Sequence, residues 1–139
     1  MRVVIVSGGF DPIHSGHIEH FKAAKKLGDI LIVGLNSDEW LTRKKGKPFL
    51  PLEERLAVVK SMRPVDSAVP FNDDNDSSID LIKKTLVLFD DVIFANGGDR
   101  TQDNIPEIYE FDKDPRVQFA FGVGGTHKQN SSSWILKKW

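Results

Sequence analysis

Short apolar runs alternate with longer amphipathic segments along the 139-residue chain. Val3 to Val6 is a continuous apolar run, rich in β-branched residues and bounded by glycine, which is typical of a buried strand. Four later runs have the same character and are also predicted as strands: Ile30 to Leu35, Val65 to Val69, Val92 to Ala95 and Val117 to Phe121.

The segments between these runs carry apolar residues at helical spacing. From Gly16 to Leu27, apolar residues recur at three-residue steps with lysines between them, and Gly28 is a typical helix stop. Further helices are predicted to open at Pro51, to cover Ile79 to Leu88 and to close the chain over Ser131 to Trp139.

Strands that alternate with helices predict an α/β fold. We expect a single Rossmann-like, doubly wound sheet of five parallel strands, with helices on both faces and ligands at the carboxyl ends of the strands. No internal repeat or domain boundary is visible in the sequence, so residues 1–139 are interpreted as one domain.

Composition and net charge limit the classes of binding partner that we expect. The net charge of −1 gives no electrostatic footprint for nucleic acid or for an anionic membrane, although a local lysine cluster can still bind phosphate. The absence of cysteine excludes disulfides and thiolate metal sites. The sequence shows no signal-peptide pattern and no membrane-spanning run, so we expect a cytoplasmic location.

Candidate chemistry is densest in GGFDPIHSGH, residues 8–17, directly after the first strand. Gly8 and Gly9 allow backbone N–H groups to approach an anion, and the following helix start adds a favourable dipole. His14 and His17 lie near the same strand end, where imidazoles stabilise developing negative charge without a fixed full charge. The stretch therefore indicates a phosphate site.

Simpler interpretations of this stretch exist. Paired glycines often make only a tight turn, and a histidine at a helix start is often a cap. A zinc site is a weaker alternative, because His20 shares the helix face of His17 only approximately and no third ligand is obvious.

Four other segments have both a structural and a functional interpretation. The run from Arg43 to Lys47 is either a solvated basic loop or a phosphate-binding loop. Gly97-Gly98-Asp99 is either a capped turn or part of a ligand site. Ser131 to Ser133 suit both an N-cap and a phosphate seat. The acidic stretch Asn72 to Asp76 is read as a solvated loop, because its spacing lacks the features of a cation loop.

The motifs together resemble a known family. GGFDPIHSGH, AAKKLGDILIVGLNSDEW, KKGKPFLPLEERLAVVKSMRPVD, NGGDR and NSSSWILKKW follow one another in the order found in the HxGH nucleotidyltransferase superfamily. This cytidylyltransferase-like superfamily includes glycerol-3-phosphate cytidylyltransferase and heptose-1-phosphate adenylyltransferase domains. The resemblance covers nearly the whole chain.

The resemblance implies a reaction and a site. A phosphate of a small phosphorylated sugar, polyol or similar acceptor attacks the α-phosphorus of ATP or CTP, and pyrophosphate leaves. Substrate-bound Mg²⁺ and a homodimer are also implied. The implied catalytic residues are His14, His17 and Lys44. The nucleotide is expected at Gly8, Gly9, Phe10, His14, Gly16, His17, Gly97, Asp99, Ser131, Ser132 and Ser133, and the acceptor phosphate at Lys44, Lys45, Lys47 and Arg55.

Departures from the family pattern leave alternatives. Thr126 to Gln129 stand where cytidylyltransferases usually carry R-T-x-G. The GGD, NSD and P-L-E-x-R strings resemble the heptose-phosphate adenylyltransferases more closely, which favours ATP over CTP. The segment Arg100 to Glu107 matches no family motif. Arg55 has a second interpretation, as a brace for the lysine loop through Glu53 or Glu54. A nicotinate- or pantetheine-type adenylyltransferase and a catalytically silent nucleotide-binding module are the alternative functions.

Overall fold

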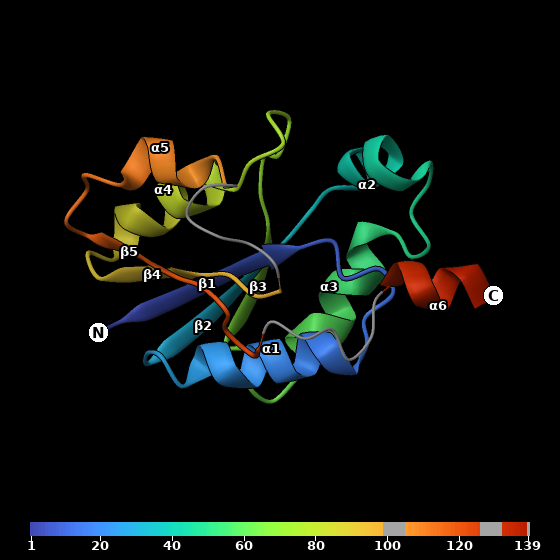
Figure 1. Cartoon of the computed structure of the whole chain (residues 1–139), viewed down its shortest axis with the longest axis horizontal. Helices are drawn as coiled ribbons and strands as arrows, with labels where there is room; N and C mark the ends of the chain where they lie inside the picture. The colour runs from blue at the N-terminus through green and yellow to red at the C-terminus, as the bar shows by residue number, and fades with distance from the viewer. Residues whose placement is uncertain (99–104, 126–131, 139) are drawn as a thin grey trace.

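A parallel sheet forms the centre of the computed structural model, which describes residues 1–98, 105–125 and 132–138. Within these residues the sheet has five strands in the order β3-β2-β1-β4-β5, and every neighbouring pair is parallel (Figure 1). The strands are β1 (Val3–Gly8), β2 (Ile30–Leu35), β3 (Ser67–Pro70), β4 (Val92–Ala95) and β5 (Val117–Ala120).

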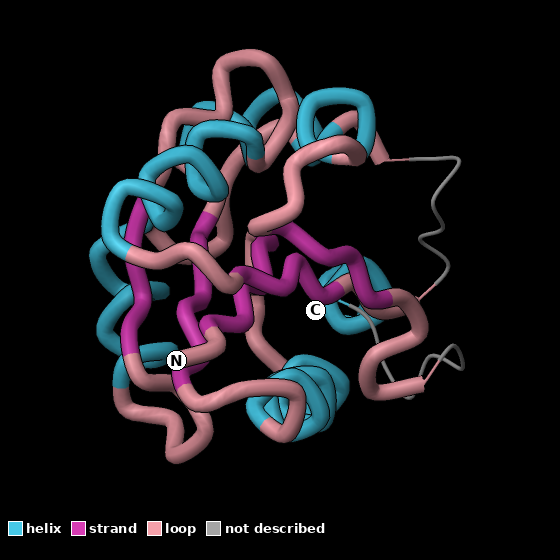
Figure 2. The backbone as a smooth tube through the Cα atoms, turned by 90° about the vertical axis from the view of Figure 1, so that its left-hand side faces the viewer, coloured by secondary structure: helices cyan, strands magenta, loops and turns pink. Residues whose placement is uncertain are grey.

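Helices cover both faces of this sheet (Figure 2). They are α1 (Ser15–Lys25), α2 (Asp38–Lys45), α3 (Leu52–Lys60), α4 (Ile79–Leu88), α5 (Glu107–Phe111) and α6 (Ser132–Lys138). The hydrophobic cluster on one face draws on α1 and α3, and the cluster on the other face draws on α4 and α5. The predicted fold class is therefore confirmed.

The central strand explains why the apolar runs are continuous. In β1, Val4 and Val6 belong to the cluster under α1 and α3, whereas Ile5 belongs to the cluster under α4 and α5. All three side chains are fully buried. Because successive side chains of a strand point to opposite faces, a strand covered on both sides needs an apolar residue at every position.

About half of the predicted boundaries agree with those observed, and the others differ by one or two residues. The strands Ile30–Leu35 and Val92–Ala95 and the helix Ile79–Leu88 agree at both ends. Strand β1 continues beyond Val6 through Ser7 and Gly8, because Ser7 pairs with Gly34 of β2. Such differences are ordinary, since the ends of elements depend on caps and pairing as well as on hydropathy.

Two helices were missing from the sequence-based prediction. Helix α2 buries only Leu41, so it lacks the apolar stripe on which the prediction relied. Its other signals are present: Ser37 caps the amino end, acids occupy the first turn and bases the last. The second missing helix, α5, has five residues and is too short for a periodic pattern.

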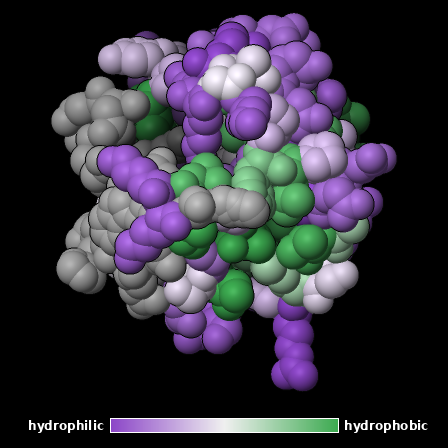
Figure 3. Space-filling model, turned by 90° about the vertical axis from the view of Figure 1, so that its right-hand side faces the viewer, coloured by the Kyte–Doolittle hydropathy of each residue, from purple (hydrophilic) through white to green (hydrophobic). Residues whose placement is uncertain are grey.

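Val65 and Phe71, which follow α3 and β3, are both buried, one in each hydrophobic cluster. On the side of the molecule that bears α2, α3 and α6, apolar residues gather in the middle of the face with hydrophilic residues around them (Figure 3). Within the described residues, no helix is long and apolar enough to cross a membrane.

Candidate active site

The two histidines of the glycine–histidine stretch form a reciprocal cap at the start of α1. The backbone N–H of Gly16 donates to Nδ1 of His14 over 3.0 Å. In return, the backbone N–H of His14 donates to Nδ1 of His17 over 3.2 Å. This is a capping box built from imidazoles instead of the usual hydroxyl and carboxylate. The simpler interpretation as a helix cap and the interpretation as an anion site thus concern the same residues.

The cap fixes the tautomer of both rings. A ring nitrogen that accepts from a backbone N–H carries no proton itself, so the proton of each neutral imidazole lies on Nε2. The ring centroids of His14 and His17 are 3.8 Å apart and the rings are stacked. The pair therefore offers two Nε2–H donors beside the amino end of an 11-residue helix, which is a suitable arrangement for an anion.

Electrostatics keep these rings uncharged at neutral pH. Burial lowers the pKa of His17 to about 3, with smaller contributions from His14, His20 and Lys45. Burial and the nearby Lys45 ammonium also lower the pKa of His14. Protonation of Nδ1 would in addition break the capping hydrogen bonds. Both histidines are thus neutral donors.

Helix α2 brings a lysine to the same turn. Lys44 and Lys45 lie in the last turn of this helix, whereas the sequence interpretation placed them in a loop; Lys47 follows in the connecting segment. Nζ of Lys45 lies 3.3 Å from the backbone oxygen of Asp11. Nζ of Lys44 instead lies over the ring of Trp40, 5.7 Å from its centroid. The structure therefore brings Lys45 to the histidine turn.

A buried carboxylate fixes the segment that follows α2. Asp11 is 1% exposed, and its two oxygens accept hydrogen bonds from the backbone N–H groups of Phe49 and Leu50. Because Asp11 belongs to the histidine stretch, this contact ties residues 46–50 to the turn that holds His14. Sequence reasoning did not assign Asp11 a role of its own.

Arg55 is the clearest correction among the candidate site residues. Its side chain is 0% exposed, so the geometry does not support direct contact with an acceptor phosphate. The guanidinium donates to the backbone oxygens of Leu50, Gly9 and Asn36 and to the Asp38 carboxylate. Arg55 is therefore a brace, as the alternative interpretation had it, but through these groups and not through Glu53 or Glu54.

The glycines of the turn are required by close packing within the chain. A side chain at Gly8 would approach the Phe10 ring to 2.9 Å, and one at Gly9 would approach Leu41 of α2 to 2.9 Å. Phe10 is 7% exposed, adopts a positive φ of 52° and packs edge-on against His17. These three residues lie beside the histidines, and the glycine positions are explained by the chain's own contacts.

The turn after β4 also approaches the first helix. A side chain at Gly97 would come within 2.9 Å of the Val123 oxygen and 3.0 Å of Nδ1 of His20. Nδ1 of His20 lies 2.8 Å from the same oxygen. The structure thus holds Gly97 against α1 near the predicted site. Asp99, predicted beside it, lies outside the described residues.

The closing helix reaches the histidine stretch as well. Oγ of Ser132, at the start of α6, donates to the backbone oxygen of Pro12 over 2.7 Å. Ser132 is therefore next to the turn that holds His14, which is consistent with one shared site. Ser131 and the side chain of Ser133 lie outside the described residues.

A second buried carboxylate, Asp73, was missed by sequence reasoning. Its oxygens accept from Nδ2 of Asn36, from the backbone N–H of Ser37 and from Oγ of Ser37. Asp73 is 2% exposed and so fastens the loop after β3 to the start of α2. The sequence shows an acidic loop here. A loop has no periodic pattern, however, so the sequence does not indicate which of its acids is buried.

The described side chains offer no ready set of metal ligands. Among the described residues, no group of three histidine or acidic side chains is arranged to hold a metal ion. The zinc alternative therefore has no support there. Mg²⁺ remains an expectation in which oxygens of the substrates hold the ion.

Comparisons with known proteins identify the family of this chain. A family model described as cytidylyltransferase-like matches residues 5–137. The bifunctional protein HldE of Photorhabdus laumondii is 35% identical over 134 residues, which are 91% of this chain and 27% of that protein. HldE of Geobacter sulfurreducens is 34% identical, with 98% of this chain and 27% of that protein covered. The chain spans about a quarter of the length of these curated relatives.

Solved structures give the same result for the fold. A lipopolysaccharide core biosynthesis protein from Thermoplasma volcanium has a TM-score of 0.67 and 29% identity, covering 87% of this chain and 95% of its own. A protein of unknown function from Archaeoglobus fulgidus, 17% identical with a TM-score of 0.57, shares the fold. Since the family model spans most of the sequence and confirms the resemblance drawn from the motifs, the chain belongs to the cytidylyltransferase-like family of nucleotidyltransferases.

Proposed function

We propose that this chain transfers a nucleoside monophosphate from a nucleoside triphosphate to the phosphate of a small phosphorylated sugar or polyol. An oxygen of the acceptor phosphate forms a bond to the α-phosphorus, the bond from the α-phosphorus to the bridging oxygen of the β-phosphate breaks, and pyrophosphate leaves. The observation that carries the proposal is the pair of neutral, Nε2-protonated histidines at the start of α1, next to Lys45.

The histidine pair suits charge that develops on the triphosphate. Little covalent chemistry is required of the protein in phosphoryl transfer, so positioning and electrostatic stabilisation dominate. Neutral N–H donors at a helix start strengthen as negative charge builds up on the phosphate oxygens. We assign this role to His14 and His17.

Lysine side chains suit the phosphates of both substrates. Lys45 is tied to the histidine turn, so it is our first candidate for contact with the reacting phosphates, and Lys44 and Lys47 are candidates for the acceptor phosphate. Arg55 acts as a positioning residue, because its buried guanidinium connects the turns after β1 and β2 to the segment before α3.

Mg²⁺ held by oxygens of the triphosphate would supply charge neutralisation. We expect ATP as the donor, on the departures of residues 126–129 from the cytidylyltransferase pattern. A sugar acceptor is favoured by the similarity to the Thermoplasma volcanium protein, which is a lipopolysaccharide core biosynthesis protein. The homodimer and the cytoplasmic location remain predictions from the resemblance and the sequence.

A substrate matrix tests this proposal. The protein is incubated with each of four nucleoside triphosphates and with hexose 1-phosphates, heptose 1-phosphates, glycerol 3-phosphate, nicotinate mononucleotide and phosphopantetheine, and pyrophosphate release is measured. We expect release with ATP and a sugar phosphate. Release only with nicotinate mononucleotide or phosphopantetheine supports the alternative adenylyltransferase. Nucleotide binding without release for any acceptor supports a silent module.

A further inference from the structure

A third histidine lies on the first helix, beyond the pair that caps it. His20 is in the second turn of α1, three residues after His17, so the two side chains are neighbours on the helix surface. Nδ1 of His20 lies 2.8 Å from the backbone oxygen of Val123. A carbonyl oxygen can only accept, so Nδ1 of His20 carries the proton. In a neutral ring this is the opposite tautomer to the one that the cap imposes on His17.

The His20 hydrogen bond attaches the turn after β5 to α1. Val123 is held from both sides, because its backbone N–H donates to the backbone oxygen of Asn96 over 3.0 Å while its own oxygen accepts from His20. The side chain of Val123 packs against the hydrophobic cluster under α1 and α3. One peptide thus joins the turns after β4 and β5 to the first helix.

The turn after β5 lies directly on the backbone of α1. A side chain at Gly124 would come within 2.9 Å of the Cα of His20. Three glycines surround Val123 in the segment Gly122 to Gly125. Because glycine loses more conformational freedom on folding than any other residue, such a segment depends on contacts to keep one conformation. The hydrogen bond from His20 is one of these contacts.

These turns lie on the opposite side of the histidine pair from the lysines. In the sheet, β1 lies between β2 and β4; α2 with Lys45 follows β2, whereas Gly97 and Val123 follow β4 and β5. Ligands of doubly wound sheets bind at the carboxyl ends of the strands where the strand order reverses, which here is between β1 and β4. A triphosphate that binds the start of α1, with its reacting phosphate toward Lys45, therefore has its nucleoside over the ends of β4 and β5.

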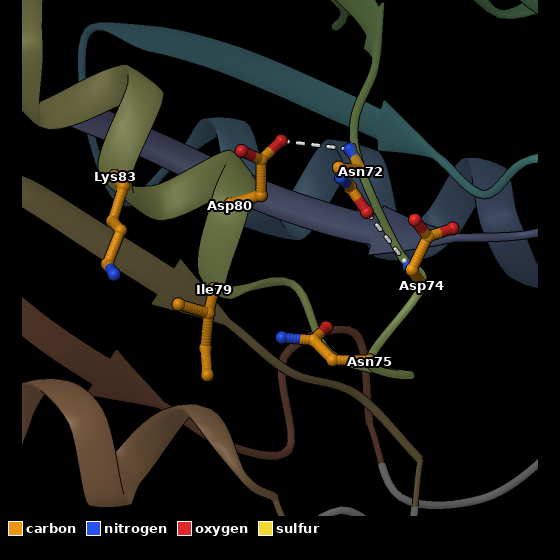
Figure 4. Close-up of a pocket in the computed structure, with 6 residues that line it drawn as sticks. All are labelled: Asn72, Asp74, Asn75, Ile79, Asp80 and Lys83. Carbon is orange, nitrogen blue, oxygen red and sulfur yellow. Dashed lines mark hydrogen bonds between the residues drawn. The ribbon is translucent and has the colours of Figure 1, made fainter.

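The loop after β3 has a different position. With the first turns of α4 it borders an open groove, and α4 covers the opposite face of the sheet from α1 (Figure 4). The residues that line the groove are Asn72, Asp74, Asn75, Ile79, Asp80 and Lys83. Most of these residues are exposed, and the loop itself stands between the groove and the lysines. We therefore assign the nucleoside to the turns after β4 and β5 and not to this groove.

We propose that His20 is a positioning residue for the nucleoside of the triphosphate. Through the Val123 oxygen it fixes the turns after β4 and β5 as a wall beside α1. The nucleoside packs against this wall while its phosphates bind the histidine pair. The inference rests on the proposed function, since it concerns the nucleotide substrate of that reaction, and His20 acts through the wall without contacting the reacting atoms.

Titration with a nucleotide and with a phosphate chain alone tests this role. The wild type and its variants are titrated calorimetrically with α,β-methylene ATP and with inorganic tripolyphosphate, at one Mg²⁺ concentration. His20→Leu lacks the donor to Val123, so we expect its Kd for the ATP analogue to rise about tenfold and its Kd for tripolyphosphate to change little. His20→Ala, which also lacks the donor, is titrated in parallel and is expected to behave in the same way.

A conservative variant is the matched control. In His20→Asn the side-chain amide nitrogen takes the place of Nδ1, so this variant is expected to bind both ligands nearly as the wild type does. Hydrogen exchange, followed by NMR without any ligand, reports on the wall itself. We expect the Val123 amide to exchange faster in His20→Leu than in the wild type and in His20→Asn.

The outcomes separate this inference from the proposed function. An unchanged Kd for the ATP analogue in His20→Leu and His20→Ala overturns the inference, and so does an equal rise for both ligands, which indicates a general effect on the fold. A wild type that binds the ATP analogue no more tightly than tripolyphosphate also overturns it. The expected pattern of binding without pyrophosphate release in the substrate matrix rejects the proposed function and leaves the role of His20 in nucleotide binding supported.

Discussion

Imidazoles that cap a helix and imidazoles that bind phosphate are usually treated as different roles, and in His14 and His17 one geometry serves both. Each Nδ1 is occupied by a backbone N–H at the start of α1, which leaves the proton on Nε2. The hydrogen bonds that fold the turn thus also set the donors of the proposed site.

Removal of the second histidine tests its catalytic assignment. Because the proposed role is stronger in the transition state than in the ground state, His17→Ala is expected to lower kcat by a factor of about 10² to 10³. Steady-state pyrophosphate release measures this, with far-UV circular dichroism as the control for folding. Near-normal turnover in a folded variant would contradict the mechanism.

The low pKa of His17 also predicts how stability depends on pH. The unfolded side chain binds a proton below its ordinary pKa of 6.5, whereas the folded one binds it only near about 3. The contribution to stability is therefore complete above pH 6.5 and is lost as the pH falls toward 3, by about 1.4 kcal/mol per pH unit.

Urea unfolding between pH 7 and pH 4 measures this slope. His17→Gln has no titrating ring, so its free energy of unfolding is expected to fall less steeply with decreasing pH, by about one proton. Equal slopes for the variant and the wild type would show that His17 is protonated in the folded chain at these pH values.

Removal of the buried Arg55 guanidinium is expected to have a large effect on stability. Arg55→Met leaves three backbone oxygens and the Asp38 carboxylate without their buried donor, and we expect a loss of about 3–5 kcal/mol in the free energy of unfolding. Arg116→Met, which removes an exposed guanidinium paired with Asp114, is the control and is expected to change stability little. A similar small effect for both would refute the brace.

At the scale of elements, α2 and the segment after it hold the lysines through contacts with distant parts of the chain. Asp73 of the β3–α4 loop binds the start of α2, and Asp11 of the histidine turn binds the backbone of residues 49 and 50. The position of Lys45 beside the histidines therefore depends on two buried acids that lie outside α2.

Loss of the Asp11 contact is expected to free this segment. Asp11→Ala removes the acceptors of two backbone N–H groups, so trypsin should cleave after Lys44 and Lys45 several times faster than in the wild type. Mass spectrometry of the early fragments measures the rate at each site. The control is Asp29→Ala, since Asp29 also accepts from a backbone N–H, that of Arg2, but far from α2. Equal cleavage in both variants contradicts the role of Asp11.

At the scale of the whole molecule, two hydrophobic clusters share one sheet. Phe21 of α1 lies in one cluster and Ile82 of α4 in the other, and both are 0% exposed. Since β1 contributes to both clusters, neither helix layer has a core that is independent of the other. We therefore expect residues 1–139 to unfold as the single domain that the sequence predicts.

Core truncations on opposite faces test the single domain. Phe21→Ala and Ile82→Ala are each expected to lower the free energy of unfolding by about 2–5 kcal/mol and to shift the same cooperative transition. Urea unfolding followed by both tryptophan fluorescence and far-UV circular dichroism checks this. Two separate transitions, each moved by only one of the variants, would indicate two independent units.

The sequence was informative wherever the signal was local. Continuous apolar runs predicted all five strands, and the helix Ile79–Leu88 agrees at both ends, because hydrophobic periodicity reflects which faces are buried. Helix α2 was missed because it buries only one residue and therefore shows no apolar stripe; its capping residue and end charges were the remaining signals. GGFDPIHSGH carries the histidine cap within four residues, so local spacing was enough to place both imidazoles at one helix start, and the anion site there stays a prediction.

Only the tertiary structure decided the contacts between segments far apart in the chain. It placed Lys45 beside the histidines instead of Lys44, and it buried Arg55 among the turns after β1 and β2. It also fastened the loop after β3 to α2 through Asp73 and Arg43. Periodicity specifies which face of an element is buried, but it carries no distance between elements, so these positions depend on how the sheet brings its loops together.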